Sequence, residues 1–379
     1  MLFSQVIGQE EAKNRLRHSY KEGRLAHAIM LVGPEGSGNL ALALSFAQYI
    51  SCPNKTETDA CGQCATCRKH QTFQFADMYY SFPYFNKAGK EETVADDYMP
   101  QWRARLDESP YFDIENWRST ITEDNKQLLI SVYEAGNIVR KLSLKSYEGG
   151  YKFMLIWMAD YLKTDTANKL LKIVEEPPEN TVFLLVANSI ENILPTILSR
   201  VQTIQIPKIA DSDIQQALEQ NGVSSETAAN IAHFSDGNYW RALRLSNADD
   251  ANSALSVLFQ SWMRFCYSRD LVALTKWVDE ISALGREDQK QFIVYALEQI
   301  RQNLLRNYLG DTLVRMNESE YSFSQKFAPF INDLNAEDLL EELNSAHVDI
   351  SRNASSKIVF MDMSLRTHHM LRRQAAVAK

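Results

Sequence analysis

The chain has 379 residues, of which 45% are hydrophobic and 23% charged, and its formal net charge is -8 at pH 7. This length predicts two or three globular domains, and the acidic balance excludes a general nucleic-acid coat, which would be basic. The apolar runs are too short to cross a membrane, and the first residues lack the pattern of a signal peptide. We therefore expect a soluble, cytoplasmic protein with no membrane partner.

The first elements follow from apolar spacing. Residues 10–20 predict a helix with one apolar face, and the apolar run 28–32 predicts a buried strand. A glycine-rich turn over 33–40 follows, and a helical pattern begins directly after it. Strand, glycine-rich turn and helix in this order are the context in which a phosphate-binding loop occurs.

The turn has the glycines of such a loop without its charges. Gly33, Gly36 and Gly38 leave backbone N–H groups free to face a phosphate. The pattern G-x-x-x-x-G-K-[ST] also needs a lysine and a hydroxyl, and Asn39 and Leu40 occupy those two positions. We therefore predict a degenerate phosphate loop that does not hold ATP.

The same turn also fits the dinucleotide fingerprint G-x-G-x-x-[GA] over residues 36–41. That fingerprint starts where the strand ends, but Gly36 lies four residues past Val32. The acidic residue that it requires about twenty positions later would be Glu57, in a polar loop. Both points disfavour dinucleotide binding.

Four cysteines follow as C-x8-C-x2-C-x2-C, namely Cys52, Cys61, Cys64 and Cys67. Four thiolates complete a tetrahedral zinc site and leave no open position, which predicts a structural Zn²⁺. The alternative is buried or redox-active thiols, since C-x-x-C also marks thiol oxidoreductases. Cys266 stands alone on an apolar helix face and is expected in the core.

The segment from about 71 to 126 is long, polar and aromatic, without clear periodicity. We interpret it as an insertion whose aromatic residues pack at least in part. A helix is expected over 128–144, with Leu129, Val132, Tyr133, Ile138 and Leu142 as its buried positions.

The apolar run 153–158 predicts a central strand of a parallel sheet. In P-loop ATPases the matching strand ends in acidic residues that hold Mg²⁺. Here it ends in Trp157 and Met158, which cannot bind a hard cation. Asp160 is expected to be a surface or capping group. The absence of acidic Mg²⁺ ligands at the end of this strand agrees with the absence of the lysine from the loop.

The remaining elements divide the chain. Helices over 166–176 and 195–199 alternate with strands over 181–187 and 203–206, which predicts an α/β domain over 1–207. Short helices without strands are expected over 208–250, and longer helices over 251–379. Their apolar stripes are positions 255, 258, 259, 262, 265 and 266, then 293, 297, 300 and 304, then 358, 361 and 365.

Ser199 and Arg200 follow the short helix that Pro195 begins. An arginine here could reach a phosphate across a subunit boundary. A surface salt bridge is the commoner role of a single arginine.

Taken together, the motifs resemble those of bacterial DNA polymerase III clamp-loader subunits of the AAA+ class. The resemblance covers nearly the whole chain except about 71–126, and it is greatest to the delta-prime type, whose phosphate loop is degenerate. It rests on Ile7-Gly8-Gln9, Gly23-Arg24-Leu25-Ala26-His27-Ala28, the phosphate loop, the cysteines, Glu148-Gly149-Gly150-Tyr151-Lys152, Ala167-Asn168-Lys169-Leu170-Leu171-Lys172, Glu175-Glu176-Pro177-Pro178, Leu198-Ser199-Arg200 and Arg352-Asn353-Ala354-Ser355-Ser356-Lys357.

The resemblance implies an AAA+ core over 1–207, a helical lid over 208–250 and a helical collar for oligomerisation over 251–379. It implies a ring with ATPase subunits and delta that loads the sliding clamp on primed DNA. Arg200, with Ser199, would be an arginine finger for a neighbour's ATP. Asn188 and Arg241 match the family's sensor positions, and Val201 replaces the usual cysteine.

Three hypotheses follow. The first is a non-catalytic stator of a clamp loader, without its own ATPase. The second is an active clamp-loader ATPase with an atypical phosphate loop, which the missing lysine and acidic residues disfavour. The third is a zinc module that binds DNA alone, which the net negative charge disfavours.

Overall fold

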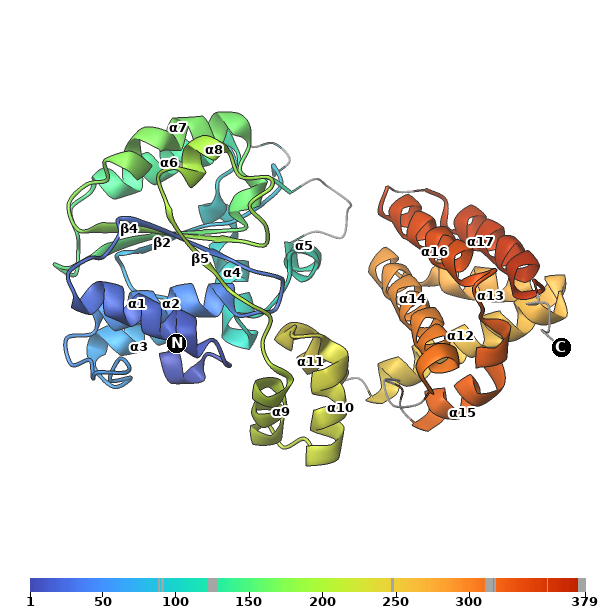
Figure 1. Ribbon diagram of the computed structural model, residues 1–379. Helices are drawn as coiled ribbons and strands as arrows, with labels where there is room; N and C mark the ends of the chain where they lie inside the picture. The colour runs from blue at the N-terminus through green and yellow to red at the C-terminus, as the bar shows by residue number, and fades with distance from the viewer. Residues whose placement is uncertain are drawn as a thin grey trace. The chain divides into compact units, whose positions relative to one another are not determined.

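The protein is described here from a computed structural model, which covers residues 1–87, 89, 92–121, 128–246, 249–310, 316, 318–352 and 354–373. The chain divides into two compact units, Met1–Ser246 and Asn247–Lys379 (Figure 1). Parts of four predicted features lie outside the described residues: 88, 90, 91 and 122–126 of the expected insertion, 247–248 of the expected lid, 311–315, 317 and 374–379 of the expected collar, and Asn353 of the C-terminal motif.

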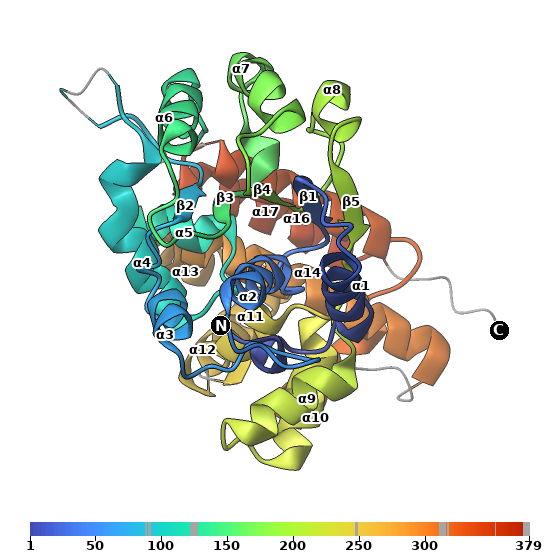
Figure 2. The same cartoon turned by 90° about the vertical axis from the view of Figure 1, so that its left-hand side faces the viewer.

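The first unit is built on a parallel sheet of five strands in the order β2-β3-β4-β1-β5, which Figure 2 shows across the sheet. Ala28 of β1 lies opposite Phe183 of β4, and Ile29 lies opposite Gln202 of β5. The predicted parallel α/β class is therefore confirmed. The strands are β1 (Ala28–Val32), β2 (Met78–Ser81), β3 (Lys152–Trp157), β4 (Thr181–Ala187) and β5 (Gln202–Gln205).

Helices cover both faces of this sheet (Figure 1). Alternate side chains of each strand point to opposite faces, so Met154 and Ile156 of β3 pack with one helix group, while Phe153 and Leu155 pack with the other. One face carries α6 (Val132–Ser143), α7 (Thr164–Glu175) and α8 (Pro195–Leu198), and the other carries α1 (Glu10–Lys21), α2 (Asn39–Ser51) and α3 (Ala65–Gln71).

No strand is predicted for the segment from about 71 to 126, and the structure differs there. Met78–Ser81 forms the edge strand β2, paired with β3 from Met78 opposite Phe153 to Ser81 opposite Ile156. Four residues within an aromatic stretch are too few for a visible alternation. The expected packing of the aromatic residues is confirmed, because Trp102 and Trp117 are fully buried. The segment also forms η2 (Ala95–Tyr98), α4 (Met99–Glu108) and α5 (Ile114–Ile121).

The helix predicted over 128–144 starts later than expected, at Val132. Leu129 and Ile130 pair instead through single bridges with Tyr84 and Leu162. Their backbone groups are thus used before the helix can begin. Two of the positions predicted to be buried face solvent, Val132 at 38% and Tyr133 at 44% exposed, whereas Ile138 and Leu142 are buried as predicted.

After β5 the first unit ends in a lid of three short helices, as the sequence predicted. They are α9 (Asp211–Gln220), α10 (Ser225–Ser235) and α11 (Tyr239–Ser246). The second unit is all-helical within its described residues, so the predicted order of α/β core, short helices and all-α C-terminal region is confirmed. Its elements are α12 (Asp249–Ser268), α13 (Leu271–Ala283), α14 (Arg286–Leu309), α15 (Glu318–Phe327), η5 (Ala328–Phe330), α16 (Ala336–Ser351) and α17 (Ser356–Leu371).

Two buried tryptophans lie in the hydrophobic core of this second unit. Trp262 and Trp277 stack with their ring centroids 5.7 Å apart, and Cys266 is fully buried beside them, as predicted. The stripe predicted at 358, 361 and 365 is wrong, because Ile358 is 71% and Leu365 is 40% exposed. The buried face of α17 contains Phe360 and Met363 together with the polar residues Ser364 and Thr367. Because two of these residues are polar, the spacing of apolar residues in the sequence does not reveal this face. No described helix has both the length and the apolarity needed to span a membrane.

Candidate functional site

The phosphate-loop segment 33–40 joins the end of β1 to the start of α2, in the strand, turn and helix order expected. Gly36 and Gly38 have φ angles of 71° and 92°, in the left-handed region that favours glycine. Tyr239 N–H of α11 donates to Gly36 O at 3.1 Å. A Cβ on Gly36 would lie 1.9 Å from Asn238 Oδ1, so the lid packs directly on this glycine.

Asn39 stands where a phosphate-binding lysine would, and its side chain turns back into the loop. Its Nδ2 donates to Gly33 O at 2.7 Å, and the Ser37 hydroxyl lies 3.0 Å from its Oδ1. Asn39 is only 6% exposed. The loop thus satisfies its own polar groups, and none of these contacts presents a cation to a phosphate.

The space beside the loop is filled by the chain itself. Tyr111 lies against Gly38, where an added Cβ would sit 3.2 Å from its ring. Its hydroxyl accepts a hydrogen bond from Ile7 N–H at 2.9 Å, and its ring meets Tyr239 edge-on at 5.0 Å. The cavity left between the loop, residues 110–112 and β3 measures about 20 Å³, room for about one water molecule.

The end of β3 is apolar as well. Trp157 lies 4.9 Å from Phe112 and 5.3 Å from Trp102, measured between ring centroids. Trp102 stacks on Phe82 at 4.3 Å and meets Trp117 at 5.3 Å. These five rings, Phe82, Trp102, Phe112, Trp117 and Trp157, form an aromatic cluster where Mg²⁺ ligands would be needed.

Two acidic residues, Glu35 and Asp160, lie at the loop. Asn188 Nδ2 donates to Glu35 Oε1 at 3.0 Å. Burial, and then the negative charge of Asp113, raise the pKa of the Glu35 carboxyl to about 7, while the Asn188 bond opposes this. Burial also raises the pKa of Asp160, which was expected to be a surface or capping group. It is partly buried, and its carboxyl group accepts backbone hydrogen bonds from Asp160 and Asn188. In their ionised form, the carboxylates of Glu35 and Asp160 would repel a phosphate rather than attract one.

Arg200 lies just past α8 and is held by its own chain. Its Nε donates to Glu175 Oε2 at 2.8 Å, and its NH1 donates to Thr196 O at 3.0 Å and lies 3.1 Å from Ser199 Oγ. The side chain remains 32% exposed. The guanidinium is therefore fixed along one edge. Arg241, the other arginine singled out by the sequence, is exposed on α11.

The four cysteines come together around the start of α3. All four Sγ atoms lie within 4.8 Å of one another, with Cys52 and Cys64 4.0 Å apart and Cys61 and Cys67 3.9 Å apart. Four thiols at this spacing can hold a metal ion. They are free cysteines rather than disulfides.

Backbone N–H groups support the thiolate form of this cysteine cluster. Cys61 N–H donates to Cys52 Sγ at 3.3 Å, and the N–H groups of Cys64 and Cys67 donate to the preceding cysteine sulfurs at 3.4 Å. Backbone donors lower the pKa of Cys61 to about 6. Burial raises the pKa of Cys67 to about 12, so that thiolate requires a cation beside it.

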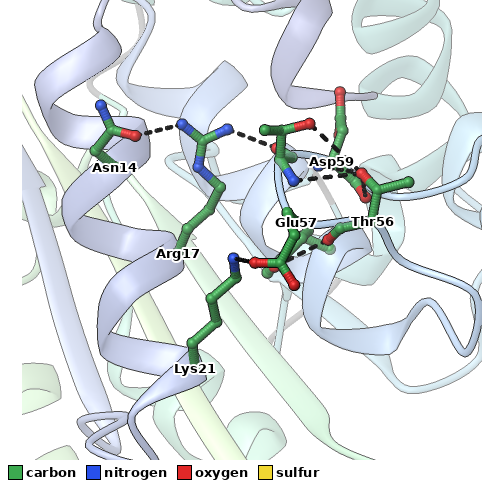
Figure 3. A network of polar contacts seen from close by, with 8 residues as sticks. Asn14, Arg17, Lys21, Thr56, Glu57 and Asp59 are labelled. Atoms are coloured by element: carbon green, nitrogen blue, oxygen red, sulfur yellow. Dashed lines mark hydrogen bonds and ion pairs between the residues drawn. The ribbon is translucent and has the colours of Figure 1, made fainter.

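The loop between the first two cysteines is tied to α1 (Figure 3). Arg17 of α1 donates to Thr58 O at 2.6 Å and to Asn14 Oδ1. Lys21 pairs with Glu57 in the same view. The carboxylate of Asp59 accepts hydrogen bonds from the backbone N–H groups of residues 3 and 4. The spacer of eight residues is thus held in place, although its sequence offered only polarity as a signal.

Comparison with known proteins points to one family. Residues 8–210, more than half of the chain, match the family model described as "DNA polymerase III, delta subunit". The tau/gamma subunit of Haemophilus influenzae is 26% identical over 216 residues, and the tau subunit of Escherichia coli is 26% identical over 217 residues. These matches cover 57% of this chain but only 25% and 27% of the two relatives, so the chain spans about a quarter of their length.

Solved structures also align with it. A DNA polymerase III gamma subunit-related protein of Thermotoga maritima has 14% sequence identity and a TM-score of 0.42, covering 96% of this chain and 99% of its own. The RuvB Holliday junction branch migration motor of Thermotoga maritima has 16% identity and a TM-score of 0.38, covering 86% and 90%.

Glutamine in place of Glu35 tests the electrostatics beside the loop. Because the pKa of this carboxyl rises from 4.5 to about 7 on folding, the folded state binds its proton more tightly. The free energy of unfolding therefore falls as the pH rises from about 4.5 to 7. Glu35→Gln keeps the acceptor for Asn188 and cannot ionise. We expect its Tm to exceed that of the wild type by about 2 °C at pH 8 and by much less at pH 5.

Thermal unfolding at the two pH values checks this, with Glu179→Gln, an exposed glutamate in the turn between α7 and β4, as the control. The control should shift the Tm at neither pH. An equal Tm shift for Glu35→Gln at pH 5 and pH 8 would show that charge is not the cause.

Proposed function

This chain belongs to the DNA polymerase III, delta subunit family, and we propose that it is the delta-prime-type, non-catalytic subunit of a clamp loader. In this role it supports ATP-dependent loading of the sliding clamp on primed DNA without an ATPase of its own. Its direct partners are the other clamp-loader subunits, both the ATPase subunits and delta. The clamp and primer-template DNA are indirect partners, and the role places the protein in the cytoplasm.

The observation that carries the proposal is the filled space beside the phosphate loop. Ligand pockets usually measure about 300–1,000 Å³, whereas the cavity here measures about 20 Å³. Binding of a nucleotide would have to displace Tyr111 and residues beside it from buried contacts. It would gain neither a lysine nor a metal ligand in return. This argues against the alternative of an active ATPase with an atypical loop.

Arg200 gives such a subunit a part in catalysis. A transferred phosphoryl group spreads negative charge over its oxygens, and an arginine supplied by a neighbouring subunit stabilises that charge. Contacts with Glu175 and Thr196 occupy Nε and NH1. We propose that these contacts orient the guanidinium so that its NH2 edge faces a nucleotide bound by the adjacent subunit.

The metal of the cysteine cluster is proposed to be Zn²⁺ in a structural role. For Zn–S bonds of about 2.3 Å, the sulfurs of a tetrahedral site lie about 3.8 Å apart. The two measured separations, 3.9 and 4.0 Å, agree with that edge. Four cysteine ligands leave no position for a substrate, so the ion would hold the loop and α3 together.

Nucleotide binding tests the missing ATPase. In calorimetry, the isolated wild-type chain should bind Mg-ATP with a Kd above about 1 mM, because only loop N–H groups could contact it. A variant with Asn39→Lys and Leu40→Thr restores the residue types of an active loop. It should still fail to bind, since Tyr111 continues to fill the space. Micromolar affinity of the wild type would contradict the proposal.

Arg200 is tested in the complex reconstituted with the partner subunits. Arg200→Ala should leave assembly intact and lower the DNA- and clamp-stimulated ATPase and the clamp-loading rate. Single arginine fingers contribute about 10³–10⁵ in GTPases, and one site among several should show less. Arg200→Lys should rescue poorly, because a point charge cannot replace the planar fork. The matched control is Arg15→Ala, at an exposed arginine of α1.

Glu175→Gln and Glu176→Gln form a second matched pair, since both glutamates are exposed and only Glu175 contacts Arg200. Only the change at Glu175 should lower the ATPase rate. If the Arg200→Ala complex loads clamps at the wild-type rate, Arg200 is a surface residue and the trans-acting role is wrong.

The zinc proposal is tested by Cys64→Ser. Cys64 caps α3 by accepting from Cys67 N–H, and serine also caps helices well. The change therefore removes one metal ligand with little effect on the helix start. Elemental analysis should give about one Zn²⁺ per wild-type chain and a large loss in the variant, with a lower Tm. Cys266→Ser, in the other unit, should keep its zinc. A metal-free, fully stable wild type would refute the proposal.

A further inference from the structure

An open apolar cavity of the second unit lies among α12, α15, η5 and α17. It measures about 200 Å³, ten times the space beside the phosphate loop. None of the functions proposed above uses it. Its lining residues are Met263, Arg264, Tyr267, Phe323, Lys326, Phe327, Phe330 and Leu371.

The cavity has firm apolar walls. Tyr267 meets Phe330 edge-on at 4.7 Å, and Phe323 stacks on Phe327 at 5.1 Å. Other lining side chains belong to the core, since Met263 is 2% and Leu371 is 3% exposed. An engineered apolar cavity of about 150 Å³ is large enough to bind benzene. This cavity therefore has room for an aromatic or branched aliphatic side chain.

Its rim is basic. Arg264 and Lys326 are exposed, and none of the eight lining residues is acidic. Arg372 adds a third cation nearby, as its NH2 donates to Tyr267 O at 3.4 Å. The positive rim contrasts with a chain whose net charge is -8. Charge complementarity favours an acidic ligand here.

We propose that this cavity docks an acidic peptide segment of a partner protein, which inserts one large apolar side chain between the aromatic walls. The side chain would be buried against Tyr267 and Phe330, and flanking carboxylates would face Arg264 and Lys326. A few buried apolar anchors supply most of the affinity in such interfaces, while charges at the rim supply specificity. The proposal is independent of nucleotide, zinc and Arg200.

Fluorescence anisotropy on the full chain tests this with three labelled pentapeptides. The first has phenylalanine flanked on each side by two aspartates, the second has lysines in place of the aspartates, and the third has alanine in place of the phenylalanine. The first should bind about tenfold or more tightly than either of the others. Its affinity should fall as salt is raised.

Two variants locate the site. Arg264→Glu combined with Lys326→Glu should reverse the preference from the acidic to the basic peptide. Tyr267→Ala, which removes one wall, should weaken binding of both phenylalanine peptides. The control combines Lys276→Glu with Arg352→Glu, which changes the net charge equally at exposed residues outside the cavity lining. It should leave the preference unchanged, and circular dichroism should show native helix content in every variant.

Three results would overturn the proposal. One is equal binding of the acidic and basic phenylalanine peptides. Another is no saturable binding of any peptide. The last is tight binding of an oligothymidylate that the Arg264 and Lys326 changes abolish while the peptides do not bind, which would assign the rim to nucleic acid.

Discussion

The packing of Tyr111 on Gly38 is the contact on which the organisation of the first unit depends. It joins three stretches that are far apart in sequence, because the Tyr111 hydroxyl accepts from Ile7 N–H and its ring meets Tyr239 of the lid. A glycine is needed at position 38, both for its φ of 92° and for the close ring. The loop shape that would suit a phosphate therefore supports internal packing, and the lid closes on protein instead of on a ligand.

The polar groups around this contact follow from the same constraint. Without a lysine or a bound phosphate, the loop must satisfy its own hydrogen bonds, which the Asn39 contacts do. Burial beside the loop raises the pKa of Glu35, so its ionisation becomes costly. Restoring a single catalytic residue would leave this packing unchanged. In the proposed role, the chain contributes Arg200 to a neighbour's reaction instead.

Much of this fold follows from the sequence. For the parts that could not be predicted, there is a physical reason. Strands β1 and β4 have continuous apolar runs, and C-x2-C spacing brings sulfurs together through one turn. These strands and the cysteine cluster were therefore predictable. Strand β2 was missed because four residues within an aromatic segment show no period. Tyr111 was visible only as one aromatic residue among many. Nothing local marks it, since its contacts are with residues 7, 38 and 239.

The two cavities show why an apolar count alone is a poor guide to binding. Aromatic residues are abundant at both, yet at the phosphate loop they close the space to about 20 Å³ and on the second unit they leave about 200 Å³ open. The difference lies in where the rings are anchored. The Tyr111 ring lies against Gly38 and closes the first space. Phe323 and Phe327 instead both pack on the core residue Phe259 and leave the second space open. Open apolar volume beside exposed positive charge is what a ligand can use, and of these two cavities the second offers both.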